Sequence, residues 1–184
     1  TVELGDGQSF VIAGLTSNAV SWIEVGHGVS IGLSPDQFPP ATVPDQRTFE
    51  LARELANGAQ VGAVLVPALA SPAVLDTALD HLDFIRLAPG PGMLDGCLPY
   101  VEAIRARGKK VFLQLVKTHT YRPDTLVERV RPLVDQGLFG VFVVDTAGCM
   151  TPQDVGRYVS LLRDAFEVPI GFHGHNNACL AVTN

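Results

Sequence analysis

Two histidines near the end of the sequence, His173 and His175, have a spacing that suits metal binding. They follow the apolar run 169–172 and precede Asn176 and Asn177. Side chains two residues apart on a β-strand project from the same face, so both imidazoles would reach one point near the strand's end. Together with one carboxylate from elsewhere they would form a facial triad that leaves coordination positions for substrate. A pair of histidines in a polar loop is the alternative.

Short apolar runs alternate with amphipathic segments along the chain, and this alternation predicts parallel β-strands joined by helices. The predicted strands are 1–4, 21–25, 60–66, 83–87, 110–116, 140–144 and 168–172. The predicted helices are 44–57, a helix opening at 71–72, 94–107, 123–136, 151–166 and the first turns of a helix at 177–184. Several of the strands lack polar alternation, which is typical of strands buried on both faces.

The predicted fold class is α/β: a TIM (β/α)8-type barrel in one domain over residues 1–184, with about seven βα units and the eighth missing. An open doubly wound sheet is the alternative. Polar or turn residues recur at the carboxyl ends of the strands, and a barrel would bring all of these ends to one mouth. They are Asp6, Glu24, His27, Pro67, Pro89, His119, Asp145, His173 and His175. The proline-rich loop 34–44 is expected to lie over the same mouth as a lid.

Composition excludes several classes of protein. The 184 residues are 47% apolar and 17% charged, which is enough to bury a core. The net charge of −6 and the lack of a basic cluster argue against nucleic acid. No apolar run is long enough to cross a membrane, and no signal peptide opens the chain, whose first residue, Thr1, suggests processing or trimming. Three cysteines, Cys97, Cys149 and Cys179, fit neither a disulfide framework nor a zinc ribbon, so we expect structural thiols and a cytoplasmic location.

Three motifs at successive strand ends resemble one known superfamily. They are Ile23-Glu24-Val25-Gly26-His27-Gly28, Asp145-Thr146-Ala147-Gly148 and His173-Gly174-His175-Asn176-Asn177. Their order is similar to that of the metal-dependent lyase and synthase barrels (the DRE-TIM metallolyases), which include 4-hydroxy-2-oxovalerate aldolase, hydroxymethylglutaryl-CoA lyase and isopropylmalate synthase. The Glu-Val-Gly-His-Gly form is most similar to the aldolases, and the likeness covers essentially the whole chain.

The resemblance implies roles for particular residues. Asp6, His173 and His175 would bind Mn²⁺ or Mg²⁺, both of which accept oxygen and imidazole ligands. Thr146 and Thr118 would contact a 2-oxo or hydroxy acid substrate. Glu24 and His27 are weak catalytic candidates, with hydrogen bonding around the site as the alternative.

Two residues depart from the family pattern. Gly5 stands where the family has its catalytic arginine, and Ser9 stands where the aldolases have the histidine that is thought to act as base. Loss of one electrostatic donor typically lowers the rate about 10²–10³-fold. The sequence therefore predicts a divergent member, which either uses another cation, with Lys117 and Arg122 as candidates, or catalyses little. Solvated loop charges are the alternative for those two residues.

Three functions follow from the resemblance. The first is an aldolase that cleaves a 4-hydroxy-2-oxo acid to pyruvate and an aldehyde, and the second is an enzyme that joins an acyl-CoA to a 2-oxo acid. The third is a metal-binding barrel of low activity that serves as an interaction subunit. Family aldolases pair with an acylating aldehyde dehydrogenase, so we expect such a partner. An incomplete barrel leaves open strand edges, which also predicts a homo-oligomer or a longer natural chain.

Overall fold

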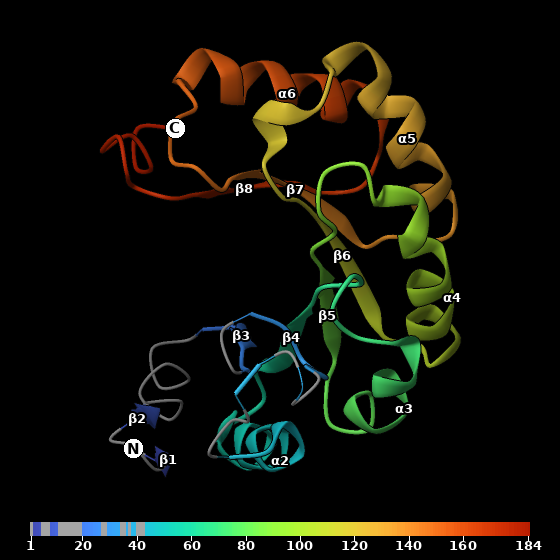
Figure 1. Cartoon of the computed structure of the whole chain (residues 1–184), viewed down its shortest axis with the longest axis vertical. Helices are drawn as coiled ribbons and strands as arrows, with labels where there is room; N and C mark the ends of the chain where they lie inside the picture. The colour runs from blue at the N-terminus through green and yellow to red at the C-terminus, as the bar shows by residue number, and fades with distance from the viewer. Residues whose placement is uncertain are drawn as a thin grey trace.

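The computed structural model describes residues 2–4, 8–10, 20–26, 29–33, 36, 38, 39 and 43–184, the first two ranges as backbone alone. Six parallel strands form one curled sheet in the order β3-β4-β5-β6-β7-β8, so every strand lies beside its neighbour in sequence (Figure 1). The strands are β3 (Trp22–Glu24), β4 (Gln60–Leu65), β5 (Phe84–Leu87), β6 (Lys110–Leu115), β7 (Gly140–Asp145) and β8 (Ile170–Gly174). This is an incomplete TIM-type barrel, as the sequence predicted, and not a doubly wound sheet.

Helices connect the strands and line the outer side of the curl, whereas its inner side carries none in the described part of the chain (Figure 1). The α-helices are α2 (Asp45–Leu55), α3 (Leu75–Ala78), α4 (Leu98–Ala106), α5 (Pro123–Asp135) and α6 (Pro152–Ala165). The described residues also form three short 3₁₀ helices, η1 (Pro72–Val74), η2 (Leu94–Cys97) and η3 (Thr118–Thr120). None of the described helices is long and apolar enough to span a bilayer.

The segment predicted as the first barrel strand is placed differently. Residues Val2–Leu4 form strand β1, but β1 pairs antiparallel with β2 (Gln8–Phe10) in a separate two-stranded sheet. So short a connection can join antiparallel neighbours, whereas parallel strands need a crossover of about a dozen residues or more. The described parallel sheet therefore has six strands, one fewer than expected.

The two faces of the sheet differ, which corrects the expectation of strands buried on both faces. Alternate residues on the outer face, such as Val61, Ile85, Leu113 and Val143, are fully buried and pack against the helices. Their neighbours point to the inner face, because strand side chains alternate. Inner-face residues include aromatic and charged side chains, so this face holds the candidate site.

Capping residues mark the start of one helix and the end of another. Thr151 accepts a hydrogen bond from the backbone N–H of Asp154, whose carboxylate accepts one from the backbone N–H of Thr151; together they form a capping box that starts α6. Gly137, at φ 100°, ends the helix before β7, where a side chain would be strained. The predicted helix at 177–184 is wrong: the segment forms turns, and Cys179 at φ 60° is outside the helical range.

Candidate metal and substrate site

A cavity of about 330 Å³ opens on the inner face of the sheet. Its lining residues are Trp22, Glu24, Phe84, Arg86, Phe112, Phe142, Phe172 and His173. The aromatic rings make most of the wall, and the three polar side chains come from different strands. A mostly apolar cavity with a few convergent polar groups is the usual form of a small-molecule site.

Arg86 is the cation of this cavity, and the sequence analysis missed it. Its guanidinium lies 2.8 Å from the carboxylate of Glu24 and 5.0 Å from the centre of the Phe142 ring. Its Nε is buried and has no hydrogen-bond partner among the described residues. Arg86 thus carries a charge that Glu24 orients and a donor that a ligand oxygen would satisfy. The sequence does contain a signal for this residue, because an arginine interrupts the otherwise apolar run 84–87.

His173 extends from β8 into the same cavity and is partly buried. Burial lowers its pKa, the neighbouring Arg86 and His175 lower it further, and Glu24 acts in the opposite direction. The imidazole is therefore kept neutral at neutral pH. A neutral ring has a nitrogen lone pair free for a metal ion.

His175 lies just past the end of β8, with its ring centre 5.0 Å from that of His173. Its Nδ1 is 2.8 Å from the carbonyl oxygen of Thr146 and 3.1 Å from that of Asp145. Carbonyl oxygens only accept hydrogen bonds, so Nδ1 carries a proton, and in the neutral ring Nε2 then presents a lone pair. Metal-binding histidines are typically oriented in this way by a bond from the second ring nitrogen.

The histidine pair thus fits the divalent ion that the resemblance implies: two neighbouring rings, with the Nδ1 proton of His175 held by backbone carbonyls. The other residues expected here are only partly accounted for. Asp6, the expected third ligand, and His27 lie outside the described residues, as do Gly5 and parts of the 34–44 loop. Ser9 is described as backbone alone. The assignment of Asp6 stays a prediction.

The two threonines predicted to contact substrate have different surroundings. Thr146 is partly buried, and its hydroxyl accepts a hydrogen bond of 2.8 Å from the backbone N–H of Lys117. Thr118 is fully buried; its hydroxyl donates to the carbonyl of Leu115 and accepts from the backbone N–H of Val144. Both hydroxyls hold the loop after β6 against β7. The burial of Thr118 gives it no route to a substrate in this structure, whereas Thr146 lies at the mouth.

The cations suggested as substitutes for the missing arginine lie elsewhere. Lys117 is exposed. Arg122 is also exposed and pairs with Asp124 at 2.7 Å. Neither lines the cavity, so the alternative of solvated loop charges describes them better.

The loop after β7 is built around Asp145. This carboxylate is 1% exposed and accepts hydrogen bonds from the backbone N–H groups of Cys149 and Met150. Gly148 adopts φ 61°, and a Cβ there would lie 2.8 Å from the backbone nitrogen of Asn177. The Asp-Thr-Ala-Gly motif thus fixes the loop whose carbonyls orient His175.

Comparison with known proteins defines the class. Residues 94–184 match the HMGL-like family model. The chain is 41% identical over 174 residues to an oxaloacetate decarboxylase of Mycobacterium tuberculosis, covering 95% of this chain and 52% of that protein. It is 33% identical over 175 residues to 4-hydroxy-2-oxovalerate aldolase 4 of Rhodococcus opacus, covering 95% of this chain and 50% of that protein.

The chain belongs to the HMGL-like family, within the DRE-TIM metallolyase superfamily that the three motifs indicated. It spans about half the length of the curated relatives it matches. The fold is shared with the N-terminal domain of a Bacteroides vulgatus protein, at a TM-score of 0.71 and 21% identity, over 90% of this chain and 56% of that one.

Proposed function

We propose that this protein is a divalent-metal-dependent lyase that cleaves a carbon–carbon bond of a 2-oxo acid and releases pyruvate. The observation that carries the proposal is the convergence of His173 and the Arg86–Glu24 pair on one cavity, with the ring of His175 5.0 Å from that of His173. The names of the two relatives support it, because loss of CO₂ from oxaloacetate and retro-aldol cleavage of 4-hydroxy-2-oxovalerate both leave pyruvate.

The chain's own residues have separate tasks in this proposal. His173 and His175, joined by Asp6, would hold Mn²⁺ or Mg²⁺, which supplies Lewis-acid stabilisation of charge developing on the substrate's oxygens. Arg86 places a positive charge beside the cavity, where an anionic substrate gains most from it. Glu24 orients that guanidinium. The aromatic wall lowers the local dielectric and so strengthens these interactions.

Decarboxylation of a 2-oxo diacid of the oxaloacetate type is the favoured reaction. When the C3–C4 bond breaks, CO₂ leaves, the electron pair stays on C3 in conjugation with the C2 carbonyl, and a solvent proton then restores pyruvate. No base has to remove a proton first. Retro-aldol cleavage requires removal of the 4-hydroxyl proton, and Ser9 stands where the aldolases have their histidine. The aldolase is the second candidate, supported by the Glu24–Gly28 motif.

Pyruvate release tests the proposal and separates the candidates. The protein with Mn²⁺ is given oxaloacetate or 4-hydroxy-2-oxovalerate, and pyruvate is measured with lactate dehydrogenase and NADH. Free metal also decarboxylates oxaloacetate, so the His173→Ala variant with the same Mn²⁺ is the baseline. Release above this baseline from oxaloacetate supports the decarboxylase, and release from the hydroxy acid supports the aldolase. Release from neither substrate contradicts the proposal and favours the non-catalytic subunit.

The condensing enzyme and the expected associations have their own tests. Free thiol released from acetyl-CoA in the presence of a 2-oxo acid would indicate the condensing enzyme instead. An aldehyde dehydrogenase partner and a homo-oligomer stay predictions, which a size measurement and co-purification address.

A further inference from the structure

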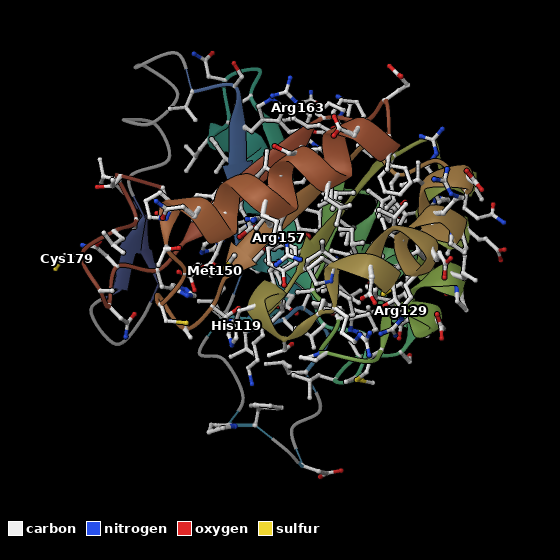
Figure 2. The ribbon with its side chains drawn as sticks, turned by 90° about the horizontal axis from the view of Figure 1, so that it is seen from above. His119, Arg129, Met150, Arg157, Arg163 and Cys179 are labelled. Carbon is white, nitrogen blue, oxygen red and sulfur yellow. The ribbon has the colours of Figure 1, made fainter. Side chains whose placement is uncertain are left out.

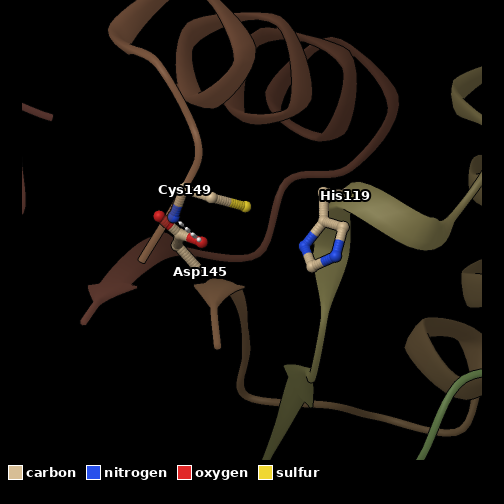
Figure 3. Close-up of side chains that lie close together, drawn as sticks. All are labelled: His119, Asp145 and Cys149. Carbon is tan, nitrogen blue, oxygen red and sulfur yellow. Dashed lines mark hydrogen bonds between the residues drawn. The ribbon is translucent and has the colours of Figure 1, made fainter. Parts of the chain in front are cut away.

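A second group of metal-binding side chains lies in the loops after β6 and β7, apart from the histidine pair. His119 lies in η3, Asp145 ends β7 and Cys149 lies in the loop before α6. One imidazole nitrogen, one carboxylate oxygen and the Cys149 sulfur all lie within 4.8 Å of one another. Figure 3 shows the Cys149 sulfur directed toward the His119 ring, with the Asp145 carboxylate beside it. The sequence analysis treated Cys149 as a structural thiol and had no signal for this grouping.

The cluster combines one fixed ligand with two adjustable ones. Asp145 is buried, and two backbone N–H groups hold its carboxylate at 2.9 and 3.1 Å. Each of its oxygens keeps a further lone pair for a cation. His119 and Cys149 are exposed, so their side chains are free to close in. Ligand atoms around tetrahedral zinc are roughly 3.5 Å apart, so closure needs shifts of about 1 Å.

The charge balance also favours a cation. No described lysine or arginine forms an ion pair with Asp145, although its carboxylate is almost fully buried. Two neutral N–H donors offset only part of the cost of burying a charge. A dication bound by this carboxylate and a thiolate would leave the group close to neutral.

We propose that His119, Asp145 and Cys149 form a second metal site that binds Zn²⁺. Sulfur and imidazole ligands select zinc over Mg²⁺ and Mn²⁺, whereas the His173–His175 pair has no sulfur ligand among the described residues. Three protein ligands leave a fourth position for water. Because Nδ1 of His175 bonds to the carbonyls of Asp145 and Thr146, zinc would fasten the loop that orients His175.

Cobalt is the probe that tests the site, because Co²⁺ bound by a thiolate gives an intense near-ultraviolet charge-transfer band. Co²⁺ is titrated into the wild-type protein and into the Cys149→Ser, Cys179→Ser and His173→Ala variants. Cys179 is the control: it is also exposed, and Figure 2 shows it at the edge of the molecule, away from His119. We expect one equivalent of the band in the wild type, in Cys179→Ser and in His173→Ala, and none in Cys149→Ser.

Two further measurements test His119 and Cys149 as ligands. His119→Ala is expected to weaken Zn²⁺ binding by about 100-fold, with an unchanged circular dichroism spectrum. Zn²⁺ should protect Cys149 from alkylation, mapped by mass spectrometry, and leave Cys179 reactive. A wild type without the band, a band that survives Cys149→Ser, or equal protection of both cysteines would overturn the proposal. Persistence of the band in His173→Ala separates this site from the lyase metal, so either proposal can fail alone.

Discussion

The inner face of the sheet has two ends with different chemistry. At the strand starts, Trp22, Phe84, Phe112 and Phe139 pack against one another, mostly edge to face, with ring centres 5.1–6.0 Å apart. At the carboxyl ends, Glu24, Arg86, His173 and His175 gather instead. The same strands thus place apolar area at one end and charge at the other. The aromatic end packs the sheet and lends Trp22, Phe84 and Phe112 to the cavity wall, whereas the charged end supplies the groups that could bind a metal or an anion.

Two glycines, which have no side chain, make room for the aromatic rings. A Cβ at Gly62 would lie 2.3 Å from the Phe84 ring, and a Cβ at Gly171 would lie 2.5 Å from the Phe142 ring. Because Phe142 in turn lies under the guanidinium of Arg86, the packing of rings reaches the charged end. The two ends are therefore distinct in chemistry but joined through Phe142.

The largest effect is expected at the charged end. His173→Ala removes one of two neighbouring imidazoles, so Mn²⁺ affinity measured by calorimetry should fall by about 100-fold or more. Stability to urea should change by less than about 1 kcal/mol, because the ring lies at a strand end. His81→Ala is the control, since His81 lies in a turn outside the cavity. Equal losses in both variants would contradict the assignment.

Arg86→Met tests the cation of the cavity. Removal of one preorganised charge should lower kcat/KM for pyruvate release by about 10²–10³-fold, while Mn²⁺ still binds. Arg122→Met, which removes an exposed cation paired with Asp124, should leave kcat/KM unchanged. Should the Arg122 variant lose activity and the Arg86 variant keep it, the loop cation would be the functional one.

Phe112→Ala tests the aromatic end. Phe112 contacts four other rings, so its loss should lower the free energy of unfolding by about 3 kcal/mol, measured with urea. The affinity of the folded protein for Mn²⁺ should stay within about threefold of the wild type. Unchanged stability, or a collapse of metal affinity alone, would break the division between the two ends.

The smallest effect is expected away from both ends, at the capping box of α6. The Thr151 hydroxyl and the backbone N–H of Thr151 lower the pKa of Asp154. This carboxylate therefore stabilises the fold fully above its unfolded pKa of about 3.9, and the contribution is lost as pH falls through the lower folded value. Asp154→Asn should thus have a lower free energy of unfolding than the wild type at pH 7, and this difference should shrink as the pH falls below the unfolded pKa. If the difference in free energy of unfolding between the two proteins were the same at pH 7 and at low pH, the ionised Asp154 carboxylate would not be what stabilises the cap.

Local patterns were enough to predict most elements of the fold. Apolar runs marked β4 to β8, and the predicted helices 123–136 and 151–166 match α5 and α6 within a residue or two at each end. The antiparallel pairing of β1 was not predictable in this way, because strand direction depends on which segments meet.

The site was predicted in part, for a related reason. The His173–His175 pair follows from spacing along one strand. The Glu24–Arg86 contact spans 62 residues and crosses β4, so it depends on the register of three strands. The tautomer of His175 is set by backbone carbonyls on another loop, which no sequence motif specifies.

Pulsed electron paramagnetic resonance of the Mn²⁺-loaded protein, labelled with ¹⁵N-histidine, tests the central claim most directly. The account predicts hyperfine coupling to two imidazole nitrogens, reduced to one in His173→Ala and in His175→Ala. A spectrum of bound Mn²⁺ without coupling to ¹⁵N would contradict it, because the ion would then be held by oxygen ligands alone.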